Sequence, residues 1–413
     1  EYRAYLTEGK QRFPLDKWFC GSYRNYIPDH YQFGYQLVAW SRERYGDDMW
    51  SRVADYGARR PYTILTTKWA LRKYYRTSVN RIARSTLDDL TRFWRSQPVE
   101  PNSAAILPTP LTSYTVYKSP MRLDGSTLLA LKKDMDRPNR LVAVDLATGR
   151  ERRIAWTGSV NTPPVLGDSV IYWSEYRSST LWEQRVFSVA CRYDLRTGRR
   201  KTLRKRGNAL YPTPLPGGRL VTVGYDYTGQ YLLDRGDGRR FPFPRTMSVH
   251  GLAYDSLTRT LAFIGLDDEG MSIGAIDPES GAIRTLLKPS YVSIYNLRAG
   301  AGLLSFNSIQ SGKDEIHLYD LRAGRQYRLS RSRYGSLSPS APEADSLYYF
   351  TTYTLDGYRL STQRATADSL VEVEYSELPV DRVNPPRRKW DVMNIDTVDV
   401  SFELAEGTPD KRF

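Results

Sequence analysis

Three histidines are the first residues to test for chemistry, because imidazole can both bind a metal and transfer a proton near neutral pH. The chain of 413 residues contains only His30, His250 and His317, which lie far apart in the sequence. None begins the H-E-x-x-H pattern that places two zinc ligands and a general base on one helix face. The sequence therefore predicts no metal, no cofactor and no catalytic set in this chain.

The residues next to His30 and His317 suggest where these two histidines lie and what they could do. His30 and Tyr31, in "PDHYQFGY", could stabilise a tetrahedral oxyanion in a hydrolase. Alternatively, Asp29 caps a helix that begins at His30, and Tyr31 packs against the protein. His317 is separated from Glu315 by one residue, which fits the solvent-facing side of a strand.

Five aspartates recur at regular intervals of 49, 40, 43 and 43 residues. Each stands between two β-rich runs and is followed by a glycine, as in "VAVDLATGRERRI" and "GAIDPESGAIRTL". Asp accepts backbone N–H hydrogen bonds within a tight turn, and Gly supplies the positive φ that the turn requires. We therefore interpret them as structural turn residues, not as metal ligands or general acids: Asp145, Asp194, Asp234, Asp277 and Asp320.

A period of 40–50 residues with strand–turn–strand content is typical of β-propeller blades. One further step reaches Gln363, in "DGYRLSTQRATADSLVEV", which has the strand pattern without the Asp–Gly turn. The predicted fold is mainly β. It is a six-bladed β-propeller over residues 111–380, with a degenerate last blade, preceded by a small α-helical domain.

A second repeat precedes the turns, as in "VYKSPMRLDGSTLLAL", "NTPPVLGDSVIYW" and "LYPTPLPGGRLVTV". It resembles the Y-x-SP-x-x-SPDG-x-x-I-x-F pattern of TolB-like propellers, which are relatives of WD40-like repeats. In that family the residues that open each blade lie near the central channel, where partners or peptides dock. The resemblance implies a rim and channel built from Ser119, Pro120, Thr162, Pro163, Pro212, Thr213, His250, Tyr295, Ser338 and Pro339.

Residues 1–97 have helical periodicity. In "YQFGYQLVAWSRERYG" five residues fall near one face of a helix: Tyr31, Tyr35, Val38, Arg42 and Tyr45. A second helix follows Ser78 as N-cap, with one apolar stripe: Val79, Ile82, Ala83, Thr86, Leu87, Leu90 and Trp94. We expect residues 98–110 to be a linker with little structure, and residues 381–413 to be a C-terminal extension.

The segments "GSYRNYIPDHY" and "ARRPY" resemble the region that follows the active site in gluzincin peptidases of the peptidase MA type. The combination with a TolB-like propeller resembles large cell-envelope proteins of Bacteroidetes-type bacteria. By this resemblance, residues 1–97 are the helical remnant of a gluzincin-like domain. Its zinc-binding half would precede Glu1, and zinc would be a cofactor only if that half exists.

The formal net charge is +14, and residues 1–97 hold 18 Lys and Arg against 10 Asp and Glu. A basic balance favours nucleic acid, anionic lipid or an acidic protein as partner. No nucleic-acid-binding motif occurs, so we expect no nucleic-acid partner. The expected partners are other envelope or outer-membrane proteins and an anionic membrane surface. Cys20 and Cys191 fit either redox compartment.

Together these features predict a non-enzymatic, protein-binding scaffold of the bacterial cell envelope. It would be associated with the outer membrane, on either the periplasmic or the external side. In this function the propeller is the docking platform of a larger membrane assembly. The alternative is part of a zinc metallopeptidase whose H-E-x-x-H half lies upstream, with the propeller gating or recruiting substrate. A substituted upstream motif would make it a pseudo-peptidase.

Overall fold

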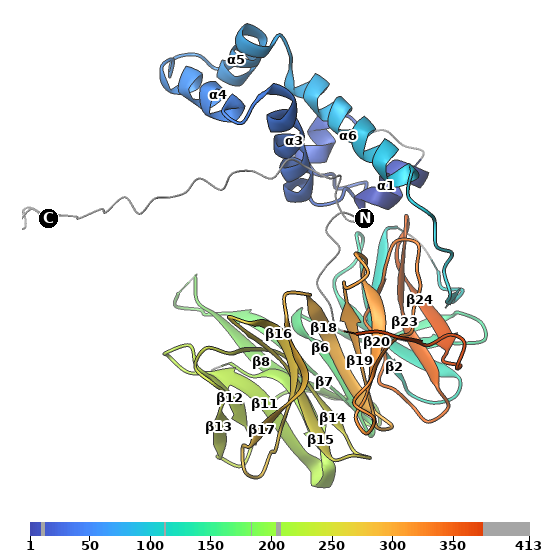
Figure 1. Cartoon of the computed structure of the whole chain (residues 1–413). Coiled ribbons are helices and arrows are strands. Elements are labelled where there is room, and N and C mark those ends of the chain that lie inside the picture. Colours follow the sequence, from blue (N-terminus) through green and yellow to red (C-terminus); the bar gives the residue numbers. More distant parts are fainter. Residues whose placement is uncertain (10–12, 111–112, 183, 204–207, 375–413) are drawn as a thin grey trace, which may run out of the picture.

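The computed structural model describes residues 1–9, 13–110, 113–182, 184–203 and 208–374. Helices occupy the first part of the chain, and strands follow from Ala105 onward (Figure 1). The predicted C-terminal extension, residues 381–413, lies outside the described residues. No helix in these ranges is both long and apolar enough to cross a membrane.

The helical region packs around one aromatic-rich core in which Trp18, Phe33 and Leu71 are buried. Its helices are α1 (Tyr2–Glu8), α2 (Leu15–Cys20), α3 (His30–Tyr45), α4 (Met49–Ala58), α5 (Thr66–Tyr75) and α6 (Val79–Arg95). The prediction for α6 is confirmed. The Ser78 hydroxyl accepts a hydrogen bond from Arg81 N at 3.3 Å, and the predicted stripe contributes to the core.

The first part of the predicted face of α3 is exposed. Tyr31, Tyr35 and Val38 face solvent, whereas Phe33 and Leu37 are buried. At the end of the same face Tyr45 is partly buried and packs against the core. The sequence contains two apolar stripes on this helix, and helical periodicity alone does not say which of them meets the core. The choice is made by Trp18 and Phe19 of α2, whose rings lie 5.9 and 5.2 Å from that of Phe33.

The strand region is mainly β, with a propeller arrangement. Four sheets contain four or five strands, and a fifth contains eight. The eight-stranded sheet combines β2 (Thr115–Arg122), β3 (Thr127–Asp134), β4 (Arg140–Asp145) and β5 (Glu151–Trp156) with β22 (Ser336–Leu337), β23 (Leu347–Thr354), β24 (Gly357–Arg364) and β1 (Ala105–Ile106). The second sheet comprises β6 (Ser159–Gly167), β7 (Val170–Ser178), β8 (Val186–Asp194) and β9 (Arg200–Thr202).

The remaining three sheets are consecutive in the chain. The first comprises β10 (Leu210–Leu215), β11 (Arg219–Tyr225), β12 (Tyr231–Asp234) and β13 (Arg240–Pro242), with a short 3₁₀ turn, η1 (Pro216–Gly218). The next comprises β14 (Ser248–Asp255), β15 (Thr260–Asp267), β16 (Gly270–Ile276) and β17 (Ile283–Ser290). The last comprises β18 (Ile294–Gly300), β19 (Leu303–Ser308), β20 (Glu315–Asp320), β21 (Gln326–Arg328) and β25 (Val371–Glu372).

The strand sets contact one another in a closed order. The sets that begin with β2, β6, β10, β14, β18 and β22 are neighbours in that sequence, and β23 contacts β2. Strands β2 and β24 join in parallel through only two residue pairs, Thr115 with Gly357 and Val116 with Tyr358. All other pairings are antiparallel, as expected for meander sheets arranged around an axis.

The interval predicted to be an unstructured linker contains a strand. β1 pairs antiparallel with β24, and Ser103 N donates to Arg331 O at 2.9 Å. The N-terminal segment thus supplies the outer strand beside β24. The strand that follows β24 in the chain, β25, therefore pairs with β21 of the preceding sheet instead.

Four of the five turn aspartates share one geometry. Asp145 accepts hydrogen bonds from the backbone N–H of Ala147 and Thr148, at 3.1 and 2.7 Å, and Gly149 has φ of +69°. Asp194, Asp277 and Asp320 accept the equivalent bonds in their own turns. Asp234 accepts instead from Gly236 N and Arg240 Nε. Hydrogen bonds from the Thr148 hydroxyl and backbone lower the pKa of Asp145, so this carboxyl stays ionised and holds the turn.

Candidate functional site at the propeller channel

The innermost strands carry an irregularity where they line the channel. The register against the next strand shifts in β2 between Lys118 and Met121, in β10 between Leu210 and Thr213, and in β18 between Tyr295 and Arg298. At these places a residue other than glycine has positive φ: Ser119, Tyr211 and Asn296, and likewise Ser338 just after β22. Bulges of this kind redirect side chains and are common beside binding sites.

The redirected strands surround a cavity of about 490 Å³, called here the cationic cavity. Residues from β2, β6, β10, β14 and β18, together with Ser338, line it. Six of the ten predicted rim residues meet there: Ser119, Thr162, Pro163, His250, Tyr295 and Ser338. A volume of this size is within the range of pockets that hold small ligands or a short peptide segment.

The other four predicted rim residues do not line this cavity. Thr213 faces a second cavity of about 490 Å³ at the other end of the channel. Pro120, Pro212 and Pro339 are buried and line neither cavity. The dipeptide Ser119–Pro120 follows the alternation of a strand and turns only Ser119 to the cavity, whereas Thr162 and Pro163 both line it.

The charge of the cationic cavity is one-sided. Lys118 and Arg298 line it with His250, and none of the described lining residues is Asp or Glu. Lack of solvation inside the channel lowers the pKa of Lys118, and the nearby Lys133 lowers it further. Burial also lowers the pKa of His250, whose Nε2 lies 2.9 Å from the Ser248 hydroxyl. The cavity can thus receive an anion but has no carboxylate to act as a base.

Arg298 marks the waist of the channel. Arg298 lines both cavities of the channel, as do Pro164, Val165 and Leu252. From β18 its Nη2 reaches across to β6 and donates to Pro164 O at 2.9 Å. The side chain is almost wholly buried, and the lack of solvation lowers the pKa of the guanidinium to about 10. Sequence reasoning missed this residue because it comes after the bulge, outside the motif that opens each blade.

Asparagines organise the wall beside Arg298. Asn296 Nδ2 donates to Asn307 Oδ1 at 3.0 Å, and Asn307 Oδ1 also accepts from Ser338 N at 2.9 Å. Across the cavity Asn161 donates to the Ser188 hydroxyl, but its Oδ1 is buried without a hydrogen-bond partner. Tyr295 donates from its hydroxyl to Asp314, and burial raises the pKa of both groups. This wall offers at least one free acceptor to a ligand.

The two remaining histidines lie elsewhere. His30 begins α3 on the surface, where Asp29 caps the helix by accepting from Tyr31 N at 3.0 Å. The rings of His30 and Tyr31 are 4.4 Å apart and exposed. The three histidines therefore do not converge, and the described residues contain no group of three His, Cys, Asp or Glu side chains that could hold a metal.

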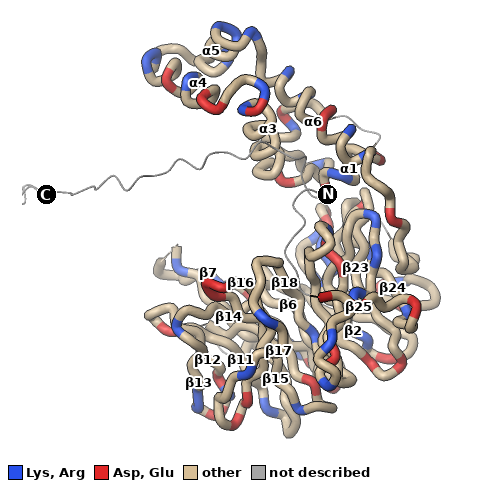
Figure 2. Tube along the Cα trace, in the orientation of Figure 1, with Lys and Arg blue, Asp and Glu red and all other residues tan. Residues whose placement is uncertain are grey.

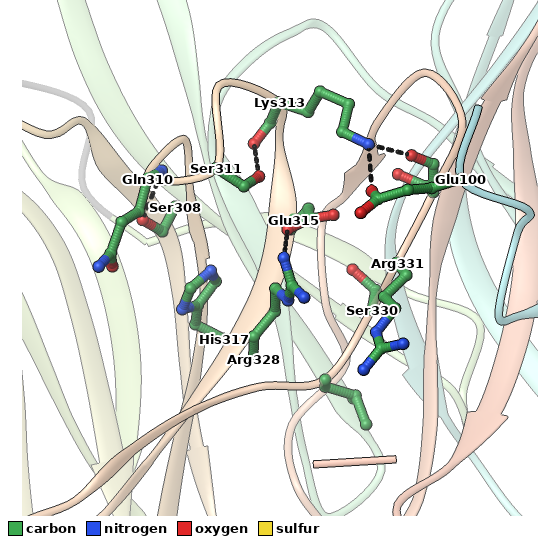
Figure 3. Close-up of polar contacts among 12 residues, drawn as sticks. Glu100, Ser308, Gln310, Ser311, Lys313, Glu315, His317, Arg328, Ser330 and Arg331 are labelled. Carbon is green, nitrogen blue, oxygen red and sulfur yellow. Dashed lines mark hydrogen bonds and ion pairs between the residues drawn. The ribbon is translucent and has the colours of Figure 1, made fainter. Parts of the chain in front are cut away.

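His317 is not on a strand surface, as the sequence suggested. It is 1% exposed and Glu315 is fully buried. The ring of His317 lies beside that of Phe306 of β19, with centroids 6.0 Å apart, and its Nδ1 is 2.9 Å from Gln326 Nε2 of β21. Figure 3 shows Arg328 directed toward Glu315, at 3.4 Å, and Lys313 toward Glu100, at 2.6 Å. Burial raises the pKa of Glu315 and lowers that of His317 to about 3. The cluster fastens the linker to the propeller.

The helical region contacts the end of the propeller where β2 and β22 begin. The Tyr26 and Tyr114 rings stack at 3.6 Å, Thr7 and Tyr334 share a hydrogen bond of 2.9 Å, and Arg333 pairs with Glu8. Tyr114 comes just before β2, and Tyr334 comes shortly before β22. Lys118 and Ser119 of β2 and Ser338, which follows β22, line the cationic cavity. The helices are therefore anchored beside this mouth of the channel.

No family model and no curated protein matches the sequence. Among solved structures the chain is similar to β-propeller proteins. TolB from Acinetobacter baumannii is 14% identical, with a TM-score of 0.41 over 69% of this chain and 70% of that one. The β-propeller domain of the Trilobed protease from Pyrococcus furiosus is 14% identical, with a TM-score of 0.41 over 64% and 99%.

An oligogalacturonate lyase in complex with manganese is also similar, with 14% identity and a TM-score of 0.43 over 66% of this chain and 98% of that one. At this level of identity the likeness concerns the arrangement of strands alone.

Proposed function

We propose that this protein is a non-enzymatic scaffold of the bacterial outer-membrane envelope, whose propeller docks another protein within a larger membrane assembly. The observation that carries the proposal is the cationic cavity, to which residues from every strand set around the channel contribute. Such a cavity is a rigid, concave binding surface. His250 of this cavity lies 2.9 Å from the Ser248 hydroxyl, but Ser248 itself does not line the cavity, and no carboxylate among the lining residues orients the imidazole.

We infer that the propeller has six blades. The eight-stranded sheet counts as two blades, because β2–β5 and β22–β24 with β1 meet only at the two parallel pairs of β2 and β24. Each of these sets is otherwise an antiparallel meander of four strands. On this interpretation β1 closes the ring by completing the last blade from the N-terminal side. This closure supports a rigid docking platform.

The envelope setting is part of the proposal. It is supported by the resemblance of the repeats to TolB-like propellers, and by the resemblance of residues 1–97 to the C-terminal part of a gluzincin domain in Bacteroidetes-type envelope proteins. A remnant of this kind would explain why a helical region with exposed aromatic side chains, such as Tyr31 and Tyr35 on α3, is anchored beside the channel.

An anionic membrane surface is the second proposed partner. Residues 56–87 contain eight Lys and Arg and no Asp or Glu. The connection between α4 and α5 exposes Tyr62 and Ile64, at 84% and 97%, and Trp69 of α5 is half exposed. Aromatic and apolar side chains among cations are the composition of surfaces that lie in a lipid headgroup region.

The docking proposal is tested by affinity purification of the full-length protein from its native membrane, with identification of the proteins that accompany it. His250→Glu places a carboxylate in the cationic cavity, and His30→Glu is a matched control because both histidines are exposed. We expect His250→Glu to reduce the co-purified partner about tenfold or more, and His30→Glu to leave it unchanged.

Two results would contradict the proposal. One is a partner that both variants retain equally. The other is a full-length protein that purifies alone and degrades peptides in a zinc-dependent manner, which would support the metallopeptidase alternative instead.

A further inference from the structure

Arg298 differs from the other buried arginines of the described residues in its surroundings. Arg140 pairs with Asp134, and Arg235 lies 2.8 Å from Glu279. Arg359 donates to the carbonyl and the hydroxyl of Thr109. Arg298 is 7% exposed and has no carboxylate partner, and within the described residues its only hydrogen bond goes to Pro164 O. It alone among these four lines the cationic cavity.

A buried charge without a counterion is costly, and native proteins seldom keep one unless something compensates it. Arg298 uses one of its five N–H donors on Pro164, and the guanidinium borders both cavities of the channel. The planar fork of Arg matches a carboxylate in a two-pronged arrangement. The counterion of Arg298 is therefore best supplied by an anionic group of a ligand in the channel.

The rest of the lining indicates what carries the anion. Lys118 supplies a second cation. Asn161 Oδ1 is a buried acceptor without a partner, which suits a backbone N–H of a ligand. Apolar side chains such as Val160, Met271 and Ile294 complete the wall, which fits an organic chain better than a bare inorganic ion.

We propose that the cationic cavity binds the carboxylate of a peptide segment from a partner, with Arg298 as the main contact and Lys118 as the second cation. This proposal rests on the proposed docking function and names the group that the channel recognises. The segment brings a negative charge to Arg298 and an amide N–H to Asn161. The C-terminal end of a partner chain meets this description.

The test uses the whole protein and two pools of random tetrapeptides, one with free C-terminal carboxylates and one with C-terminal amides, both lacking Asp and Glu. Native mass spectrometry measures how much of each pool is retained. We expect the wild type to retain the free acids about tenfold more than the amides, the gain typical of a hydrogen bond to a charged group.

Arg298→Gln should remove this preference, and Lys118→Met should reduce it. Lys133→Met is the matched control, because Lys133 lies on the neighbouring strand β3 but does not line the cavity. Circular dichroism on each variant shows whether it is folded. If Arg298→Gln does not fold, Lys118→Met against Lys133→Met gives the same comparison.

Equal retention of both pools, or a preference that survives Arg298→Gln, would overturn the proposal. If acetate displaces the peptides at equal concentration, the anion alone is recognised and the peptide part is wrong. A wild type that binds neither pool but still co-purifies with a partner that His250→Glu loses would leave the docking function standing and refute this inference. Selective binding of the free acids without any co-purified partner would support this inference and contradict the docking function.

Discussion

The helical region and the propeller are both basic, but they place their cations in opposite ways. Residues 56–87 display eight Lys and Arg with no acid among them, and most of these side chains are exposed. Figure 2 shows them as blue segments along α5 and its connections. In the propeller Arg298 is buried at the centre of the channel.

The difference matters because solvent changes the cost of a charge. An exposed cation costs little to keep, is screened by salt, and acts through attraction at a distance. A buried cation without a counterion is destabilising and persists where a ligand compensates it. The helical cations therefore suit contact with a broad anionic surface, whereas Arg298 suits recognition of one anion.

The largest expected effect separates two buried arginines of the propeller. Arg140→Met leaves Asp134 buried without its cation, so we expect the free energy of unfolding to fall by about 3–5 kcal/mol. Arg298→Met removes a charge that has no partner, so we expect stability equal to the wild type or higher by roughly 1 kcal/mol. Calorimetry of the propeller transition measures both.

Arg359→Met serves as the control for loss of an arginine that has hydrogen-bond partners but no carboxylate. A loss of stability in Arg298→Met as large as that in Arg140→Met would mean that Arg298 is structural. The contrast between an exposed and a ligand-directed cation would then fail.

Much of the fold was predictable because the repeats record local turn chemistry. The turn aspartates with their glycines, and the N-cap Ser78, act through hydrogen bonds to residues two to four positions away, so short motifs reveal them. The propeller arrangement follows from their period. Six of ten rim residues meet at the cavity for the same reason, because each repeat places its opening strand alike.

The remaining features depend on contacts that are distant in sequence. His317 is buried against Phe306 of β19 and Gln326 of β21, and the ion pair of Glu100 with Lys313 holds the linker to the propeller. The choice of the buried face of α3 depends on Trp18 of another helix. Arg298 acquires its position from a bulge and from Pro164, 134 residues away. No local pattern encodes any of these.

A second prediction concerns the exposed cations. Lys68, Arg72 and Lys73 lie on α5 beside the exposed Trp69. Replacing all three by Gln should weaken binding of the protein to vesicles containing phosphatidylglycerol by about 100-fold, since each surface cation contributes about 1 kcal/mol near an anionic bilayer. Vesicle sedimentation at low and high salt measures the change.

Arg152, Arg199 and Lys201 provide the matched control, because they are three exposed cations of the propeller. Their replacement by Gln should leave vesicle binding within about twofold, if the helical region is the surface that meets lipid. Equal losses in the two triple variants would show that only net charge counts, and that the two regions do not differ in this respect.

The last comparison contrasts histidines of the two regions by pH. Burial holds the pKa of His317 near 3, below its ordinary 6.5, so the folded state keeps the neutral ring. As pH falls below 6.5 the unfolded chain binds a proton that the folded chain refuses, and the fold loses about 1.4 kcal/mol per pH unit until pH approaches 3. Above 6.5 this contribution to stability is fully present.

His317→Gln should therefore reduce the acid sensitivity of unfolding between these two pH values, while His30→Gln, on the exposed start of α3, should retain that of the wild type. Denaturant unfolding at a series of pH values distinguishes the two. If the variants respond alike, water reaches the ring of His317, and its burial is less complete than its contacts with Phe306 and Gln326 imply. The propeller would then not differ from the helices in this respect.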